Sequence, residues 1–201
     1  MIRRAAFADL RWAGSQWTVW DSWTAPYTAT MKPDQAALAE TFRKDACACL
    51  NKYLPRMVHC LESLSEDDIW WRPNAASNSA GNIVLHLCGN VRQWILSGLG
   101  GARDVRERDK EFAEHGPISR QKLIDQLKDT LEEACRLIET TPVATFSREF
   151  EIQGYHVTGL EAVASVYEHF SYHAGQIIYL TKSKRGQDLH FTRLPDYKPK
   201  A

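Results

Sequence analysis

Apolar residues recur every three or four positions along four long stretches of the chain, at residues 34–63, 78–99, 119–141 and 158–184. This spacing is the pattern of an amphipathic helix, in which one stripe of the helix surface is apolar. Each helix must bury its stripe against the others. The pattern therefore predicts an all-α fold, a four-helix bundle.

Local signals mark the ends of the predicted helices. Asn78 or Ser79 suits the capping position before the second helix, because a short polar side chain can accept a hydrogen bond from the first free N–H groups. Thr158, followed three residues later by Glu161, forms a capping box at the start of the fourth helix. A tail is predicted from about residue 187.

The connections between the helices carry features of their own. Residues 143–157 alternate roughly between apolar and polar around Gly154, which predicts a short extended segment or hairpin before the last helix. Residues 103–111 are strongly charged, and we interpret them as a solvated loop, with a functional edge as the alternative. Gly81 and Gly89 in the second helix predict that another helix approaches closely there.

The first thirty residues differ from the rest of the chain. They hold four of the seven tryptophans and show no helical period, and Asp9 and Arg11 interrupt what would be the apolar stretch of a secretory signal. Met31 precedes a good helix start. We therefore interpret residues 1–30 as an over-extended reading frame and residues 31–201 as the domain. A real N-terminal arm that docks on the bundle or on a partner is the alternative.

Charge and cysteine content narrow the classes of partner. The 25 lysine and arginine residues balance 25 aspartate and glutamate residues, so no basic excess favours nucleic acid or an anionic membrane surface. No apolar run approaches the ~20 residues of a membrane-spanning helix. Five cysteines without a C-x-x-C pair are interpreted as reduced thiols of a cytoplasmic protein.

Two histidines stand out in the fourth predicted helix. His169 and His173 are four residues apart, so their side chains leave one face of the helix about 6 Å from each other. Val166 and Ile177 lie on the same face, which predicts that both imidazoles point into the bundle. Burying them is costly unless something satisfies them, and a divalent ion of zinc, nickel, copper or iron does so.

A third histidine lies in the second predicted helix. His86 stands in an apolar stretch, with Asn82 and Asn90 at four-residue steps on either side. If the second and fourth helices are neighbours, His86, His169 and His173 converge on one metal ion and leave a coordination position open for water or substrate. Core histidines satisfied by hydrogen bonds are the alternative. The spacing is not H-E-x-x-H, and no carboxylate is clearly placed as a general base.

Five motifs follow one another along the chain: WWRPN at residues 70–74, NS at 78–79, HLCGNVRQWI at 86–95, RERDKEF at 106–112 and HFSYHAGQII at 169–178. In this order they resemble the DinB/YfiT-like superfamily of metal-dependent enzymes, and most closely a DinB-like subfamily without a settled activity. The resemblance covers about residues 34–193, and residues 1–30 have no counterpart in it.

The resemblance implies a DinB/YfiT-like four-helix bundle of up-down-down-up connectivity, often a homodimer. It also implies a divalent metal, typically nickel or zinc, held by three histidines that correspond to His86, His169 and His173. Some members of the superfamily are thiol-dependent transferases that use bacillithiol, mycothiol or glutathione. A low-molecular-weight thiol and a small-molecule substrate are therefore the expected cofactor and partner, with no role for nucleic acid or membrane.

These expectations lead to a thiol S-transferase hypothesis, in which a metal-bound thiolate attacks an electrophile without the help of a protein carboxylate. A hydrolase that uses metal-bound hydroxide is one alternative, and a non-catalytic metal-binding dimer, acting as a sensor or scaffold, is another. The sequence does not name the catalytic residues. The candidates for binding substrate or thiol in the cleft are Asn82, Asn90, Gln176, Arg106 and Arg108.

Overall fold

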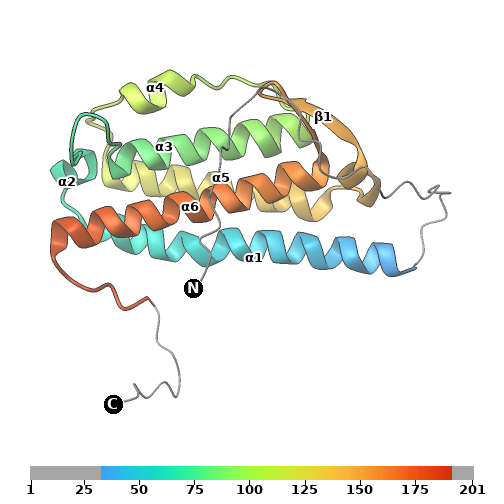
Figure 1. Cartoon of the computed structure of the whole chain (residues 1–201), viewed down its shortest axis with the longest axis horizontal. Coiled ribbons are helices and arrows are strands. Elements are labelled where there is room, and N and C mark those ends of the chain that lie inside the picture. The colour runs from blue at the N-terminus through green and yellow to red at the C-terminus, as the bar shows by residue number, and fades with distance from the viewer. Residues whose placement is uncertain (1–32, 192–201) are drawn as a thin grey trace, which may run out of the picture. The chain divides into compact units, whose positions relative to one another are not determined.

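The computed structural model describes residues 33–191, and the predicted N-terminal extension lies outside the described residues (Figure 1). Four long helices form the bundle, and short elements join them. The long helices are α1 (Pro33–Ser63), α3 (Ala80–Val91), α5 (Arg120–Thr140) and α6 (Gly159–Arg185). The short elements are α2 (Glu66–Trp70), η1 (Arg92–Leu99), α4 (Arg108–Ala113), η2 (Val143–Ser147), β1 (Glu149–Ile152) and β2 (Tyr155–Thr158).

The long helices have the up-down-down-up order that the resemblance implied. α1 and α6 run in one direction, and α3 and α5 run in the other (Figure 1). α1 packs on α5 and α6, and α3 packs on the same two helices. The two helices that carry the predicted ligands, α3 and α6, are therefore antiparallel neighbours. The prediction of an all-α four-helix bundle is confirmed.

The predicted capping signals begin both of these helices. Ser79 caps α3 in a capping box with Asn82, and Thr158 caps α6 in a capping box with Glu161. The side chains satisfy backbone N–H groups that have no partner inside the helix, which fixes where each helix starts. These starts in turn fix which residues of α3 and α6 face each other.

The hairpin before α6 is also confirmed. β1 and β2 pair antiparallel, with Ile152 opposite Tyr155. Gln153 and Gly154 form the two-residue turn with φ of 55° and 79°, as a type I′ hairpin turn requires. The hairpin packs on η1, where the Nε1–H group of Trp94 donates to the Gln153 side-chain oxygen over 3.3 Å.

Two features between α3 and α5 differ from the sequence predictions. The second helix does not stay α-helical to its end, because residues Arg92–Leu99 form the π-helical segment η1. The charged stretch is not simply a solvated loop, since it contains α4, and the side chains of Arg106 and Glu111 are only 4% and 10% exposed. Because α3 and α5 run in the same direction, residues 100–119 must cross back along the bundle, and α4 lies on this crossover (Figure 1).

The cysteines and the small residues complete the description of the interior. All five cysteines are free thiols, and all except Cys49 are buried. Gly81 is covered by the indole of Trp70 from the short connecting helix, and not by another long helix as the sequence suggested. None of the described helices combines the length and the apolar character that crossing a membrane requires.

Candidate metal centre

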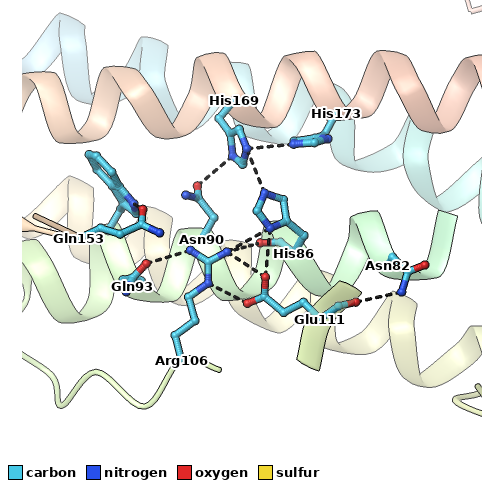
Figure 2. A network of polar contacts seen from close by, with 10 residues as sticks. Asn82, His86, Asn90, Gln93, Arg106, Glu111, Gln153, His169 and His173 are labelled. Carbon is cyan, nitrogen blue, oxygen red and sulfur yellow. Dashed lines mark hydrogen bonds and ion pairs between the residues drawn. The ribbon is translucent and has the colours of Figure 1, made fainter. Parts of the chain in front are cut away.

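The imidazoles of His86, His169 and His173 meet between α3 and α6 (Figure 2). The Nε2 atom of His169 lies 3.2 Å from Nε2 of His86 and 2.9 Å from Nε2 of His173. One ligand atom from each ring lies within 4.8 Å of the other two. The structure thus brings together the three histidines that the sequence singled out, from two helices that are far apart along the chain.

The opposite nitrogen of each ring contacts an oxygen acceptor. Nδ1 of His86 lies 3.0 Å from the Glu111 carboxylate. Nδ1 of His169 lies 3.1 Å from the side-chain oxygen of Asn90, and Nδ1 of His173 lies 2.7 Å from that of Gln176. An oxygen acceptor forms a hydrogen bond only with a nitrogen that carries a proton. All three contacts therefore assign the ring proton to Nδ1.

This assignment leaves three Nε2 lone pairs facing one another. Two nitrogen lone pairs at about 3 Å repel unless a proton or a cation lies between them. The protonated, charged rings are disfavoured here because the site is partly removed from water. A divalent cation removes the repulsion, and neutral imidazole nitrogens are good ligands for zinc, nickel, copper or iron. The donor set therefore fits a metal ion of this class.

The protein environment favours the neutral form of the two rings on α6. Burial lowers the pKa of His169 to about 4, and the nearby His173, His86 and Arg106 add to this effect through their charge. Burial also lowers the pKa of His173, in spite of its hydrogen bond with Gln176. At neutral pH both rings therefore present an unprotonated nitrogen, which is the state that binds a metal.

An acid from the crossover completes the surroundings of His86. Arg106 holds the Glu111 carboxylate with two hydrogen bonds, from Nε over 2.7 Å and from Nη2 over 2.9 Å. Burial alone would raise the pKa of Glu111, but the hydrogen bonds from Arg106 and His86 lower it overall. Arg106 Nη2 also lies 3.1 Å from His86 Nδ1, because both groups bind the same carboxylate oxygen.

Gly89 makes room for this pair on α3. A Cβ atom at Gly89 would collide with the Glu111 carboxylate and with Nε of Arg106. The sequence predicted a close approach at Gly89, but the group that approaches is this ion pair and not another helix. Gln93 supports the pair from the side, because its side-chain oxygen accepts from Arg106 Nη1 over 2.9 Å.

The other candidate residues lie in different surroundings. Asn82 is fully buried, and its amide donates to the backbone oxygens of Glu111 and Glu114, so it anchors the crossover. Asn90 and Gln176 contact the ligand histidines, as described above. Arg108 is exposed, and its guanidinium carbon lies 4.9 Å from the centre of the Phe112 ring.

Glu111 is the main residue of the candidate metal centre that was not predicted from the sequence. It lies 25 positions after His86, in a stretch with several other acids and no helical period. The one available signal was its place in the RERDKEF motif. Phe112 was missed for the same reason, and its ring lies 4.8 Å from that of His86.

Comparison with known proteins identifies the family of this chain. Residues 38–198 match the family described as a protein of unknown function, DUF1572. No curated protein matches the chain.

Three solved structures illustrate the similarity of the fold to known proteins. A conserved protein of Enterococcus faecalis is 15% identical, with a TM-score of 0.61 over 79% of this chain and 100% of that one. A DinB-like protein of Bacillus cereus is 15% identical, with a TM-score of 0.54 over 68% and 87% of the two chains. The DinB-like protein YjoA of Bacillus subtilis is 18% identical, with a TM-score of 0.55 over 78% and 99%. The fold is thus DinB-like.

Proposed function

This chain belongs to the DUF1572 family, and we propose that it binds a divalent metal ion through His86, His169 and His173. The observation that carries the proposal is the arrangement of the ring nitrogens. Every Nδ1 atom contacts an oxygen acceptor, while the three Nε2 atoms face one another without a proton donor. Nickel and zinc are the metals that we expect, as in the superfamily that the motifs resemble.

A bound divalent ion supplies a Lewis acid, which lowers the pKa of a thiol or water molecule that binds to it. The chain itself supplies three neutral nitrogen ligands and their orientation. Asn90 and Gln176 each hold one ring from α6, and Glu111 holds the ring from α3. Three protein ligands leave room for a further ligand, which is typical of catalytic rather than structural zinc sites.

We further propose that the protein is a thiol S-transferase. The carboxylate that reaches the site, Glu111, is engaged by His86 and Arg106 and is therefore not free to act as a general base. A thiol that is deprotonated at the site needs no such base, whereas activation of water for hydrolysis usually relies on one. This contrast favours S-transfer over hydrolysis.

Arg108 is the better of the two candidate arginines for binding a thiol cofactor. Arg106 already binds Glu111 and Gln93, but no described carboxylate forms an ion pair with Arg108. Its exposed guanidinium stacks on Phe112, which packs on His86. A guanidinium in this position suits the carboxylate of a small thiol such as glutathione or bacillithiol.

Metal analysis of the purified protein, followed by an activity screen, tests both parts of the proposal. We expect stoichiometric nickel or zinc in the wild type and none in His173→Ala. With metal bound, we expect thiol-dependent loss of an electrophile such as monobromobimane, with a higher KM for the thiol in Arg108→Ala. A wild-type protein that binds no divalent metal would overturn the metal site.

The same screen separates the alternatives. Turnover of an ester or amide without added thiol would favour the hydrolase, and metal binding without any turnover would favour a sensor or scaffold. A homodimer and a cytoplasmic location also stay predictions. Light scattering of the metal-loaded protein and fractionation of the source cells would test them.

A further inference from the structure

Polar contacts help to hold the crossover between α3 and α5, residues 100–119, on the bundle. α4, its only helix, buries no apolar residue. A cavity of about 400 Å³ lies between the crossover, α3 and α5, so this part of the crossover does not rest on a filled apolar core. Instead, Asn82 and Arg72 donate hydrogen bonds to backbone oxygens of residues 111–114.

One polar contact links the crossover directly to a proposed metal ligand. Glu111 accepts from Nδ1–H of His86 over 3.0 Å while Arg106, from the same crossover, grips its carboxylate (Figure 2). The Arg106 and Glu111 side chains are almost fully buried. Gly89 opens the space that they occupy on α3.

We infer that the crossover is a clasp on the metal centre, in which Glu111 is a positioning residue that holds the Nε2 atom of His86 toward His169 and His173. The inference rests on the proposed metal site and goes beyond it, because it assigns a role to residues that do not bind the metal. The clasp is defined as residues 100–119. Arg106 is the second part of it, since it fixes the carboxylate that touches His86.

The physical argument is one of linkage. A histidine ligand whose other nitrogen is hydrogen-bonded to a carboxylate keeps one tautomer and one orientation, and loss of such a partner typically costs 10- to 100-fold in metal affinity. If the docked clasp strengthens metal binding, then the bound metal strengthens docking of the clasp by the same free energy. Metal binding at α3 and α6 should therefore also stabilise the docked state of residues 100–119.

The first test compares two glutamates of the same segment. Glu111→Gln keeps the size of the side chain but removes the charge that Arg106 and His86 share. We expect its Zn²⁺ affinity, measured by competition with a chromophoric chelator, to fall about 10- to 100-fold. Glu107→Gln is the matched control, because Glu107 is 64% exposed and pairs only with Lys110 in this segment. Its affinity should equal that of the wild type.

A spectroscopic readout separates positioning from a general loss of structure. With Co²⁺ as the probe, the visible absorption bands report the ligand field. They should shift in Glu111→Gln and stay unchanged in Glu107→Gln.

Two glycines offer a second matched pair. Gly89→Ala pushes on Glu111 and Arg106 and should weaken Zn²⁺ binding, whereas Gly175→Ala on α6 meets no atom within 4 Å and should not.

A third measurement needs no variant, so it stands even if Glu111→Gln fails to fold. Hydrogen exchange of the wild type, with and without Zn²⁺, should show slower exchange of residues 100–119 when Zn²⁺ is bound. Exchange that is the same in both states would overturn the clasp, and so would a Zn²⁺ affinity of folded Glu111→Gln equal to that of the wild type. Either result leaves the metal site standing, whereas a wild type that binds no Zn²⁺ removes both proposals.

Discussion

Two clusters of potential metal ligands lie between helices of this bundle, and they differ in what their lone pairs meet. The histidine cluster joins α3 and α6. A thiol cluster joins α1 and α5, where Cys47 donates to the backbone oxygen of Cys135 over 3.7 Å. Asn51 in turn donates to the Cys135 sulfur over 4.0 Å. Both clusters are made of residues that bind soft and borderline metals in other proteins.

The difference lies in how complete each cluster is without an ion. In the thiol cluster, Cys47 already donates its proton to Cys135. This hydrogen bond and, to a smaller extent, burial raise the pKa of the Cys47 thiol. A thiol held in this state is a poor ligand, because the thiolate is the form that binds metals. In the histidine cluster the protons all point outward, and the inward lone pairs are unused. The type of residue therefore does not by itself identify a candidate metal site. Such a site also needs lone pairs that point toward one another and are not used in hydrogen bonds.

The largest expected effect comes from removing a ligand from each cluster in turn. His169→Ala should lose stoichiometric zinc, because His169 is the ring whose Nε2 contacts those of both other histidines. Cys135→Ser should keep its zinc, since its thiol belongs to a cluster that is complete without an ion. Elemental analysis of the two purified variants measures the contrast, and zinc loss from Cys135→Ser alone would reverse our reading of the two clusters.

The second expected effect is on stability. A ligand that binds only the folded state, present at 100 times its Kd, stabilises that state by about 2.7 kcal/mol. Zinc at this level should raise the free energy of unfolding by this amount in the wild type and in Cys135→Ser, but not in His169→Ala. Urea unfolding with and without zinc gives the three differences. Equal stabilisation of His169→Ala would mean that the metal binds elsewhere.

The smallest expected effect is a pH dependence of the metal-free protein. Burial lowers the pKa of His169 from its ordinary 6.5 to about 4, so the unfolded chain binds a proton there at a higher pH than the folded chain does. The stabilising contribution of the neutral ring is therefore complete above pH 6.5 and is lost as the pH falls toward 4. The hydrogen bond with Cys135 and burial raise the pKa of the Cys47 thiol, so this thiol adds no slope over this range.

Urea unfolding of the metal-free protein at several pH values between 7.5 and 5 measures this slope. The slope should be smaller in metal-free His169→Ala and unchanged in Cys135→Ser. An identical slope in all three proteins would show that His169 takes up its proton equally in the folded and unfolded states.

The bundle and its three histidines were predictable because their signals are local. Two histidines four residues apart on one helix share a face whatever the fold, and capping residues such as Ser79 and Thr158 fix where the helices begin. His86 needed one assumption, that the second and fourth helices are neighbours, which the structure bears out.

The clasp was not predictable from the sequence for the opposite reason. Residues 103–111 mix charges of both signs without a period, and this pattern is typical of a solvated loop. Nothing local tells Glu111, which is nearly buried, from Glu107, which is exposed. The distinction depends on Gly89, more than 20 residues earlier, whose missing side chain opens the space for one carboxylate. The π-helical turn of η1 likewise has no plain signature in residues 92–99.

The place of α6 as the last described helix bears on the order in which the protein is made. A ribosome releases α1, α3, the crossover and α5 first, so the partners of His86 on the crossover exist before the other two ligands. His169 and His173 arrive together on one helix, and the packing of that helix both closes the bundle and completes the set of proposed ligands. The proposed metal site is therefore complete only in chains whose synthesis has passed α6.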